Sequence, residues 1–213
     1  MTDITIIGSG NMARSIGIRA VAAGRSLQIL DRDPVKATLL AADLGASVTA
    51  GATDAVPAGD IVVLALPYDA AREVVTRYGV DLADKTVIDI TNPIDFSTFD
   101  ALVVAPGTSA AEEIAALAAP GVTVVKAFNT TFAGPLAAGS AAGVPLDVFI
   151  ASDSDEAAAA VASFVTDAGL RPIVVGPLRR ARELEGFQLL IMTLQVNPAH
   201  ETFNWNTGLT VLV

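Results

Sequence analysis

The stretch "ITIIGSGNMA", residues 4–13, decides the fold. Its first part, "ITIIG", is a short run rich in β-branched residues, which predicts a buried strand. The residues that follow form the pattern G-x-G-x-x-A of the dinucleotide-binding fingerprint, with Gly8, Ser9, Gly10, Asn11, Met12 and Ala13. Gly8 permits a sharp turn, Gly10 lets the backbone approach a pyrophosphate, and Ala13 allows close helix–strand packing. A helix that starts here would offer free N–H groups to phosphates.

The second predicted strand, "SLQILD", ends in a carboxylate at Asp31, followed by Arg32 and, one helical turn later, Lys36. An acid at this place accepts hydrogen bonds from an adenosine ribose, which favours NAD and repels a 2′-phosphate. The two cations suit a 2′-phosphate, or they are solvated charges at a helix start. From these residues alone both NAD(H) and NADP(H) stay open.

Short apolar runs alternate with Ala-rich helical segments along the rest of the chain. The predicted strands are residues 4–8, 26–31, 60–67, 85–93, 121–129, 146–153 and 171–176. The predicted helices are residues 11–24, 34–45, 68–79, 109–118, 154–169 and one from Pro177 through Gln195. This order predicts an α/β, doubly wound Rossmann-type fold: a mostly parallel sheet with helices on both faces. Residues 1–177 would form the dinucleotide-binding domain, and residues 178–213 a helical appendage that completes a second pocket or a dimer interface.

Composition excludes several classes of function. The 213 residues carry a net charge of −10, which argues against binding to nucleic acid or to an anionic membrane. The chain has no cysteine, so thiolate nucleophiles and Cys-based metal sites are excluded. There is no uninterrupted apolar stretch of membrane-spanning length, and the N-terminus resembles a strand rather than a signal peptide. We therefore expect a cytoplasmic protein.

Polar and small residues follow three of the predicted strands, where a parallel sheet binds ligands at its carboxyl edge. They are Ala65, Leu66 and Pro67, then Thr91 and Asn92, then Asn129, Thr131 and Ala133. The last group offers an amide, a hydroxyl and small residues, which suits the meeting of two planar rings; ordinary turn chemistry is the alternative for Thr91 and Asn92. The sequence shows no catalytic triad and no metal-ligand set, and its one histidine, His200, lies in the irregular tail. We therefore predict cofactor-binding residues but no catalytic side chain and no metal.

Several stretches carry a resemblance that covers nearly the whole chain: "IIGSGNMARSIGIRAVAAGRSLQILDRDPVKA", "DIVVLALPYDAAREVV", "VVKAFNTTFAGPL", "DVFIASDSDEAAAAVASFVTDAGLRPIVVGPLRRARELE" and "LLIMTLQ". In this order they resemble the F420-dependent NADP oxidoreductases, which pass a hydride between NADPH and the deazaflavin coenzyme F420. "VVKAFNT" also resembles the cytoplasmic domain of the STEAP ferric reductases. The resemblance implies NADP(H) and coenzyme F420 as cofactors. The family usually has Ser-Arg where this chain has Asp31-Arg32, and some F420-using members have His where it has Asn129.

Alternatives stay open beside this resemblance. One keeps the nucleotide and replaces F420 by FMN, another flavin or another small acceptor, and one is a dinucleotide-binding module without turnover. The basic stretch with Arg179, Arg180 and Arg182 suits either the anionic tail of F420 or ion pairs within the protein. Trp205 suits either the second pocket or an interface. The apolar final helix must be buried, either on the sheet or in a dimer interface. We expect the protein to form a homodimer.

Overall fold

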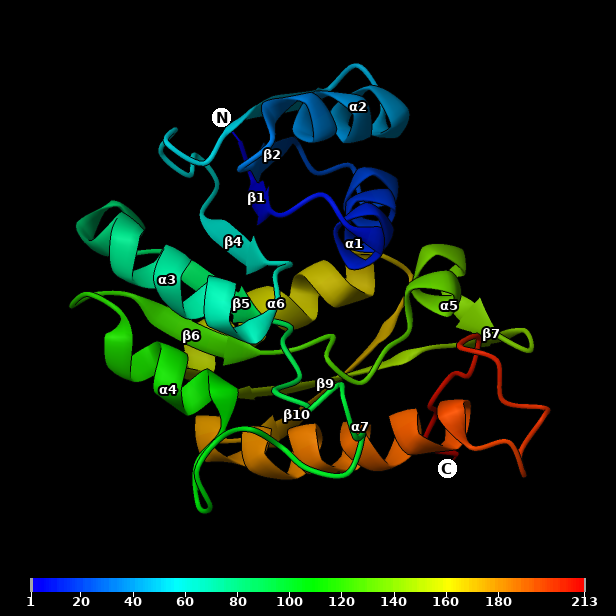
Figure 1. The fold of residues 1–213 in the computed structure, drawn as a ribbon. Helices are drawn as coiled ribbons and strands as arrows, with labels where there is room; N and C mark the ends of the chain where they lie inside the picture. Colours follow the sequence, from blue (N-terminus) through cyan, green and yellow to red (C-terminus); the bar gives the residue numbers. More distant parts are fainter. Residues whose placement is uncertain (1, 213) are drawn as a thin grey trace.

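The computed structural model describes residues 2–212, which fold around one eight-stranded sheet in the order β10-β9-β6-β5-β4-β1-β2-β3 (Figure 1). The strands from β3 to β6 run parallel, and β9 pairs with β6 in the antiparallel direction. Because β10 is parallel to β9, both outer strands on this side oppose the rest. The doubly wound, mostly parallel Rossmann-type sheet is therefore confirmed.

The strands are β1 (Ile4–Ile7), β2 (Leu27–Asp31), β3 (Val48–Ala52), β4 (Ile61–Leu64), β5 (Thr86–Asp89), β6 (Thr123–Lys126), β7 (Ser140–Ala141), β8 (Val144–Pro145), β9 (Asp147–Ser152) and β10 (Arg171–Gly176). The helices are α1 (Asn11–Ala22), α2 (Pro34–Leu44), α3 (Tyr68–Tyr78), α4 (Ala110–Leu117), α5 (Ala133–Ala138), α6 (Asp155–Asp167) and α7 (Ala181–Val196), with short 3-10 turns η1 (Gly79–Leu82) and η2 (Leu178–Arg180). None of the described helices is long and apolar enough to cross a membrane.

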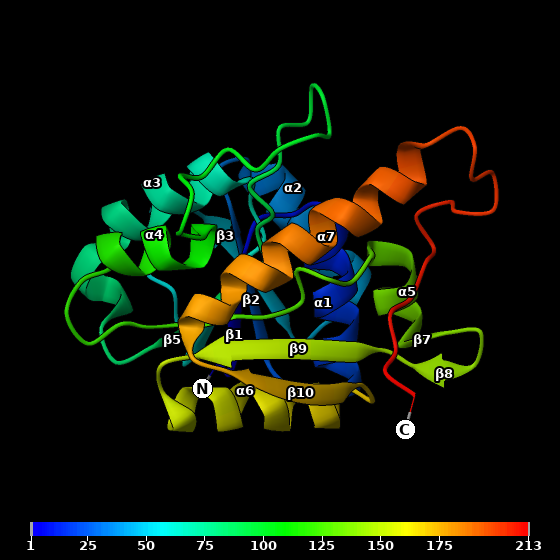
Figure 2. The same ribbon diagram turned by 90° about the horizontal axis from the view of Figure 1, so that it is seen from below.

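Alternating strand residues feed two apolar cores on the two faces of the sheet. In β1, Ile6 packs in the core under α1, α2 and α6, while its neighbour Ile7 packs in the core under α3 and α4. This alternation is the period of two expected for strands that are buried on both faces. Leu178 and Ala181 join the second core, so η2 and the start of α7 are attached to the sheet. In Figure 2, α6 lies on one side of β9 and β10, and α7 lies on the other.

Local signals placed several helix ends as predicted. Asp33 caps α2 by accepting the N–H of Val35 at 3.1 Å, with Pro34 as the first helical residue. Ser109 caps α4 by accepting the N–H of Glu112 at 3.2 Å. The Ser109 hydroxyl also donates to the Glu112 carboxylate at 2.8 Å, so serine and glutamate are spaced as in a capping box but bond through their side chains.

Other elements differ from the prediction. The edge strand β3, the short helix α5 and the β7–β8 hairpin have no predicted counterpart. Three predicted strands extend too far, since β4, β5 and β6 end at Leu64, Asp89 and Lys126 and their polar continuations are loops. Those loops form the carboxyl edge of the sheet, so this shortening concerns the site directly.

The tail after α7 turns back past β7 towards the outer strands and is fixed there (red in Figure 1). The N–H of Val211 donates to Oδ2 of Asp147 at 2.6 Å, and the N–H of Asp147 donates to the carbonyl of Leu209. Arg171 donates to both carboxylate oxygens of Asp147 and to the carbonyl of Val211. The tail therefore packs against the sheet although it contains no helix or strand.

Candidate functional site

The glycine loop between β1 and α1 has the geometry that its motif predicts. Gly8 has a φ of +113°, and a Cβ there would lie 2.3 Å from the carbonyl oxygen of Ala65, so only glycine fits. Gly10 has an ordinary φ of −77°, and a Cβ there would meet nothing within 4 Å. No side chain caps α1, and Ala13 is fully buried against the sheet. The open space at Gly10 and the uncapped helix N-terminus leave room and donors for a phosphate.

The carboxylate of Asp31 is held inside the loop. Ser9 donates its hydroxyl to Oδ2 of Asp31 at 2.7 Å, and the N–H of Asp33 donates to Oδ1 at 2.9 Å. In contrast, Arg32 and Lys36 are exposed, and neither forms an ion pair with any residue between positions 2 and 212. The end of β2 therefore presents two uncompensated cations beside a carboxylate that already accepts two hydrogen bonds.

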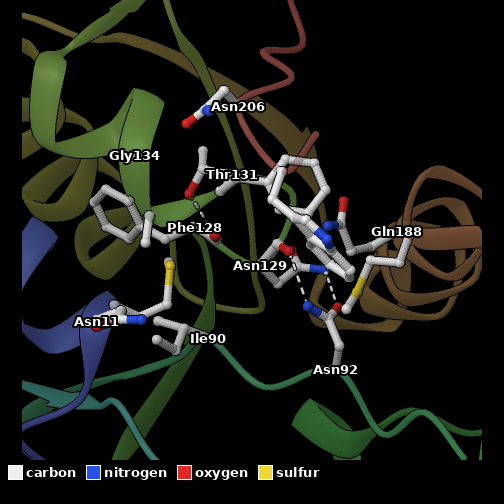
Figure 3. A pocket seen from close by; sticks show the side chains of 14 residues that line it. Asn11, Ile90, Asn92, Phe128, Asn129, Thr131, Gly134, Gln188 and Asn206 are labelled. Carbon is white, nitrogen blue, oxygen red and sulfur yellow. Dashed lines mark hydrogen bonds between the residues drawn. The ribbon is translucent and has the colours of Figure 1, made fainter. Parts of the chain in front are cut away.

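Two connected chambers lie along the carboxyl edge of the sheet. The first chamber, of about 580 Å³, is lined by Gly10, by Ala65, Leu66 and Pro67 after β4, and by Thr91 and Asn92 after β5. The second chamber, of about 450 Å³, is lined by loops after β5 and β6, by α5 and α7, and by the tail (Figure 3). The walls shared by both chambers are Asn11, Met12, Ile90, Asn92 and Met192. The two chambers therefore adjoin at these residues.

A reciprocal pair of amides joins the loops after β5 and β6 at this junction. Asn92 donates its Nδ2 to the backbone carbonyl of Asn129 at 2.9 Å, and Asn129 donates its Nδ2 to Oδ1 of Asn92 at 3.0 Å (Figure 3). The Nδ2 of Asn129 is also 3.3 Å from the carbonyl of Leu184 on α7. These bonds fix the orientation of both amides and link α7 to the strand ends.

The second chamber combines apolar walls with unsatisfied hydrogen-bond acceptors. Oδ1 of Asn129 and Oε1 of Gln188 are buried and have no partner among the described residues. The side chains that carry them are 2% and 1% exposed. A buried acceptor without a partner costs about 1–3 kcal/mol, so the walls of this chamber contain two uncompensated polar atoms. Phe128, which lines the same chamber, has a φ of +62°, an uncommon conformation for a bulky residue.

A buried cluster of charges lies directly behind the chambers. Nζ of Lys126 donates to Oδ2 of Asp89 at 2.8 Å, to Oε1 of Glu185 at 2.7 Å and to the carbonyl of Thr91. The three charged side chains are fully buried. Oε2 of Glu185 also accepts the N–H of Ala110 at the start of α4. This cluster connects β5, β6, α4 and α7, and thereby sets which face of α7 turns towards the second chamber.

The cluster shifts the pKa values of its members. Burial acts to lower the pKa of Lys126, but the carboxylates of Asp89 and Glu185 outweigh it and raise that pKa. Burial also raises the pKa of Glu185, opposed by the nearby Lys126. Lys126 is therefore an ammonium ion at neutral pH.

No described side chain stands ready as a proton donor to the chambers. Tyr68 lines the first chamber, but its hydroxyl donates to Glu113. Burial and then this hydrogen bond raise the pKa of Tyr68 far above its usual range, so the phenol keeps its proton. His200 is exposed in the tail, with its ring against Phe203. Within residues 2–212, no group of three His, Asp or Glu side chains forms a metal-ligand cluster.

The basic stretch before α7 is largely used in ion pairs. Arg182 donates Nε and Nη2 to the Glu112 carboxylate at 2.8 and 2.6 Å. Arg180 pairs with Glu183 at 3.2 Å. Arg179 is exposed and forms no ion pair with the residues that the structure describes. The structure thus supports ion pairs within the protein for two of the three arginines.

The structure brings most of the predicted site residues together. Those that line at least one chamber are Gly10, Asn11, Met12, Ala65, Leu66, Pro67, Thr91, Asn92, Asn129, Thr131 and Ala133. Those that lie outside both are Gly8, Ser9, Ala13, Asp31, Arg32 and Lys36, which shape the loop or the end of β2. Their roles in binding stay predictions.

Residues 178–213 were expected to complete a second pocket or a dimer interface, with Trp205 as a candidate, but sequence reasoning named no other residue of this region that lines the second chamber. Gln188 and Met192 of α7 line it together with Asn206 of the tail. A signal was present, because Gln188 interrupts an otherwise apolar run in "FQLLIM". The buried cluster was missed as well, although Asp89 and Lys126 each end an apolar strand with a charge.

Known proteins match this chain in both sequence and structure. A family model described as "NADP oxidoreductase coenzyme F420-dependent" matches residues 3–93. The F420-dependent NADP reductase of Methanothermobacter thermautotrophicus is 30% identical over 210 residues, covering 92% of this chain and 90% of the relative. The metalloreductase STEAP3 of Rattus norvegicus is 32% identical over 189 residues, which cover 89% of this chain. The match spans only 37% of that relative's length.

A solved structure from Arthrobacter sp. FB24, provisionally assigned as an F420-dependent NADP reductase, has a TM-score of 0.80 at 27% identity. The match covers 96% of this chain and 97% of the other. Fold, cleft and relatives together define an NADP-dependent oxidoreductase. The chain belongs to the family of F420-dependent NADP oxidoreductases, since it covers nine-tenths of a member that is 30% identical.

Proposed function

We propose that this protein transfers a hydride between NADP(H), bound along the first chamber, and coenzyme F420, whose ring occupies the second chamber. The observation that carries the proposal is the shared wall of Asn11, Met12, Ile90, Asn92 and Met192, where two rings can meet. Hydride transfer between two such coenzymes needs position and exclusion of water more than acid–base side chains. The proposal assigns no proton transfer to Tyr68, whose hydroxyl donates to Glu113.

The binding roles of the loop follow from its geometry. The N-terminus of α1 and the open space at Gly10 would receive the pyrophosphate, and Arg32 with Lys36 would hold the 2′-phosphate. Because both oxygens of Asp31 already accept hydrogen bonds, its charge opposes a 2′-phosphate less than a free carboxylate would. Loops after β4 and β5 would line the nicotinamide half of the nucleotide.

The second chamber supports a planar acceptor that carries N–H groups. Its walls are mainly apolar, and Asn129 and Gln188 place two amide side chains among them that would meet such groups. F420 and flavins share a ring with an imide N–H, so FMN or another flavin is the second candidate. A nucleotide-binding module without turnover would need no second chamber, so the cavity beside Asn129 counts against it.

The test is an assay of NADPH oxidation with purified protein and F420, followed at the visible band of the deazaflavin. Conversion of F420 at the expense of NADPH supports the proposal. Conversion of FMN or riboflavin but not F420 would replace the deazaflavin by a flavin. Failure with every acceptor, with NADPH binding intact, would leave the binding module.

A further inference from the structure

We propose that Trp205 forms the outer wall of the second chamber and stacks on the planar ring of the acceptor, and so determines affinity for that ring. This inference rests on the proposed function, because it names the residue that covers the second ring at the same site. Trp205 lines the chamber together with its neighbour Asn206, although both belong to an irregular tail.

The tail holds Trp205 in a defined place. The backbone N–H of Trp205 donates to Oε1 of Gln195, near the end of α7, at 2.9 Å, and the hydroxyl of Thr207 donates to the same oxygen at 3.2 Å. Asn206 lies against α5, since a Cβ on Gly134 would be 2.5 Å from its Oδ1. Beyond these residues, the bonds of Val211 to Asp147 and Arg171 keep the tail on the sheet. Contacts before and after Trp205 therefore hold this part of the tail in place.

The conformation of Trp205 is costly. Its φ of +63° lies in the left-handed region, which large side chains rarely adopt. Residues held in this conformation are strained and gather at ligand sites, where the surrounding structure enforces them. Phe128, in the same chamber, has a similar φ of +62°. Two aromatic residues in this conformation thus line one cavity.

The indole has an aromatic surface available for a ligand. Its ring meets Phe132 edge-on, with centroids 5.7 Å apart and planes at 86°. The residue is 41% exposed, so the protein covers it only in part. A large, partly exposed aromatic ring at the mouth of an apolar cavity suits a flat conjugated ligand, because such faces stack with little dependence on hydrogen bonding. The class of ligand is a tricyclic deazaflavin or flavin ring.

Trp205 is the only tryptophan of the chain, so the tryptophan fluorescence of the protein comes from this residue alone. The probes are F420 and FMN, titrated separately into the full-length protein while tryptophan emission is followed. Ring stacking predicts saturable quenching of this emission. Steady-state kinetics then compare the wild type with Trp205→Leu, Trp205→Phe and the control Phe203→Leu. Phe203 lies on the same tail, but its ring packs on His200 at 5.9 Å and is outside the chamber lining.

We expect Trp205→Leu to raise the KM or Kd for the ring ligand roughly tenfold, which is about 1.4 kcal/mol, because the ligand loses the aromatic face on which it stacks. The KM for NADPH should stay unchanged, Trp205→Phe should recover most of the affinity, and Phe203→Leu should resemble the wild type. Thermal unfolding of each variant shows that the comparison is made on folded protein.

The outcomes separate this inference from the proposed function. If Trp205→Leu turns over F420 with the same KM as the wild type, Trp205 does not stack on the ring, while hydride transfer between the coenzymes stands. A second outcome has no turnover: quenching of Trp205 emission by a ring ligand, together with weaker binding of that ligand to Trp205→Leu followed by the ligand's own fluorescence, would support the stacking role and overturn the hydride transfer. If Trp205→Leu loses affinity for NADPH and for the ring ligand equally, Trp205 has a general structural role and the proposed stacking is refuted. Absence of quenching by both probes would overturn it too.

Discussion

Replacing Lys126 by Met should destabilise the protein far more than replacing Glu185 by Gln. Met fits the apolar surroundings and nearly matches the lysine in length, but it removes the only positive charge of the buried cluster. Asp89 and Glu185 would then face each other as fully buried carboxylates. Glu185→Gln leaves the neutral pair of Lys126 and Asp89, so it unbalances no charge.

The magnitude follows from the burial of all three side chains. Removing one partner of a buried ion pair costs about 3–5 kcal/mol, because a charge is left uncompensated. In a chain of this size each kcal/mol lowers Tm by about 2–4 °C, so Lys126→Met should lower it by roughly 6–20 °C. Glu185→Gln loses hydrogen bonds to a charged group, which costs about 1.5–3 kcal/mol.

The pH at which the comparison is made follows from the pKa of Lys126, which is raised in the folded state. A raised pKa means that the stabilisation is fully present below the unfolded value of about 10.4 and is lost as pH rises through the folded value. Urea unfolding and thermal melts at neutral pH, without nucleotide, therefore measure the full effect. Lys36→Met is the matched control, because that exposed lysine forms no ion pair within residues 2–212.

A result in which Glu185→Gln costs as much as Lys126→Met would refute this reasoning. So would a loss below about 1 kcal/mol for Lys126→Met, since that is the range of an exposed pair.

Three further predictions concern the loop and the tail. Gly8→Ala should lower Tm because of its φ of +113° and its contact with Ala65, whereas Gly10→Ala should melt normally and bind NADPH more weakly in a titration. Arg32→Ala should weaken NADPH binding roughly 10- to 100-fold with little effect on NADH binding. Asp31→Ser should raise the affinity for NADPH relative to that for NADH. An unchanged ratio of the two affinities after Asp31→Ser would place Asp31 away from the ribose. Burial acts to raise the pKa of Asp147, but Arg171 and the N–H of Val211 lower it overall, so this tail anchor is present above pH about 3.9 and is lost in acid. Trp205 emission should report that release, and an identical acid transition in Asp147→Asn would contradict it.

Local signals explain what could be predicted from the sequence. The turn at Gly8, the packing of Ala13 and the start of α2 at Pro34 each depend on a few neighbouring residues. The edge strand β3 was missed because "VTAGA" is short, contains a glycine and has a weak apolar pattern. The strand β3 is held in place by its parallel pairing with β2, which cannot be read from the residues of β3 alone.

Polar residues at strand ends were predicted to converge, and Asn92 with Asn129 does so through reciprocal hydrogen bonds. Asp31 favours NAD(H) and Arg32 favours NADP(H), and the sequence alone could not decide between the two cofactors. Only the folded loop shows that Ser9, 22 residues earlier in the chain, occupies the carboxylate of Asp31.

The sequence by itself determined the Rossmann-type sheet, the phosphate loop and membership of the family, because these depend on short-range patterns and on their order along the chain. The tertiary structure alone decided the reversed direction of β9 and β10, the buried charges around Lys126 and the second chamber. Lys126 meets Asp89 across 37 positions and Glu185 across 59. Such contacts leave no mark in a local window, since each residue alone is a charge that water could equally well solvate.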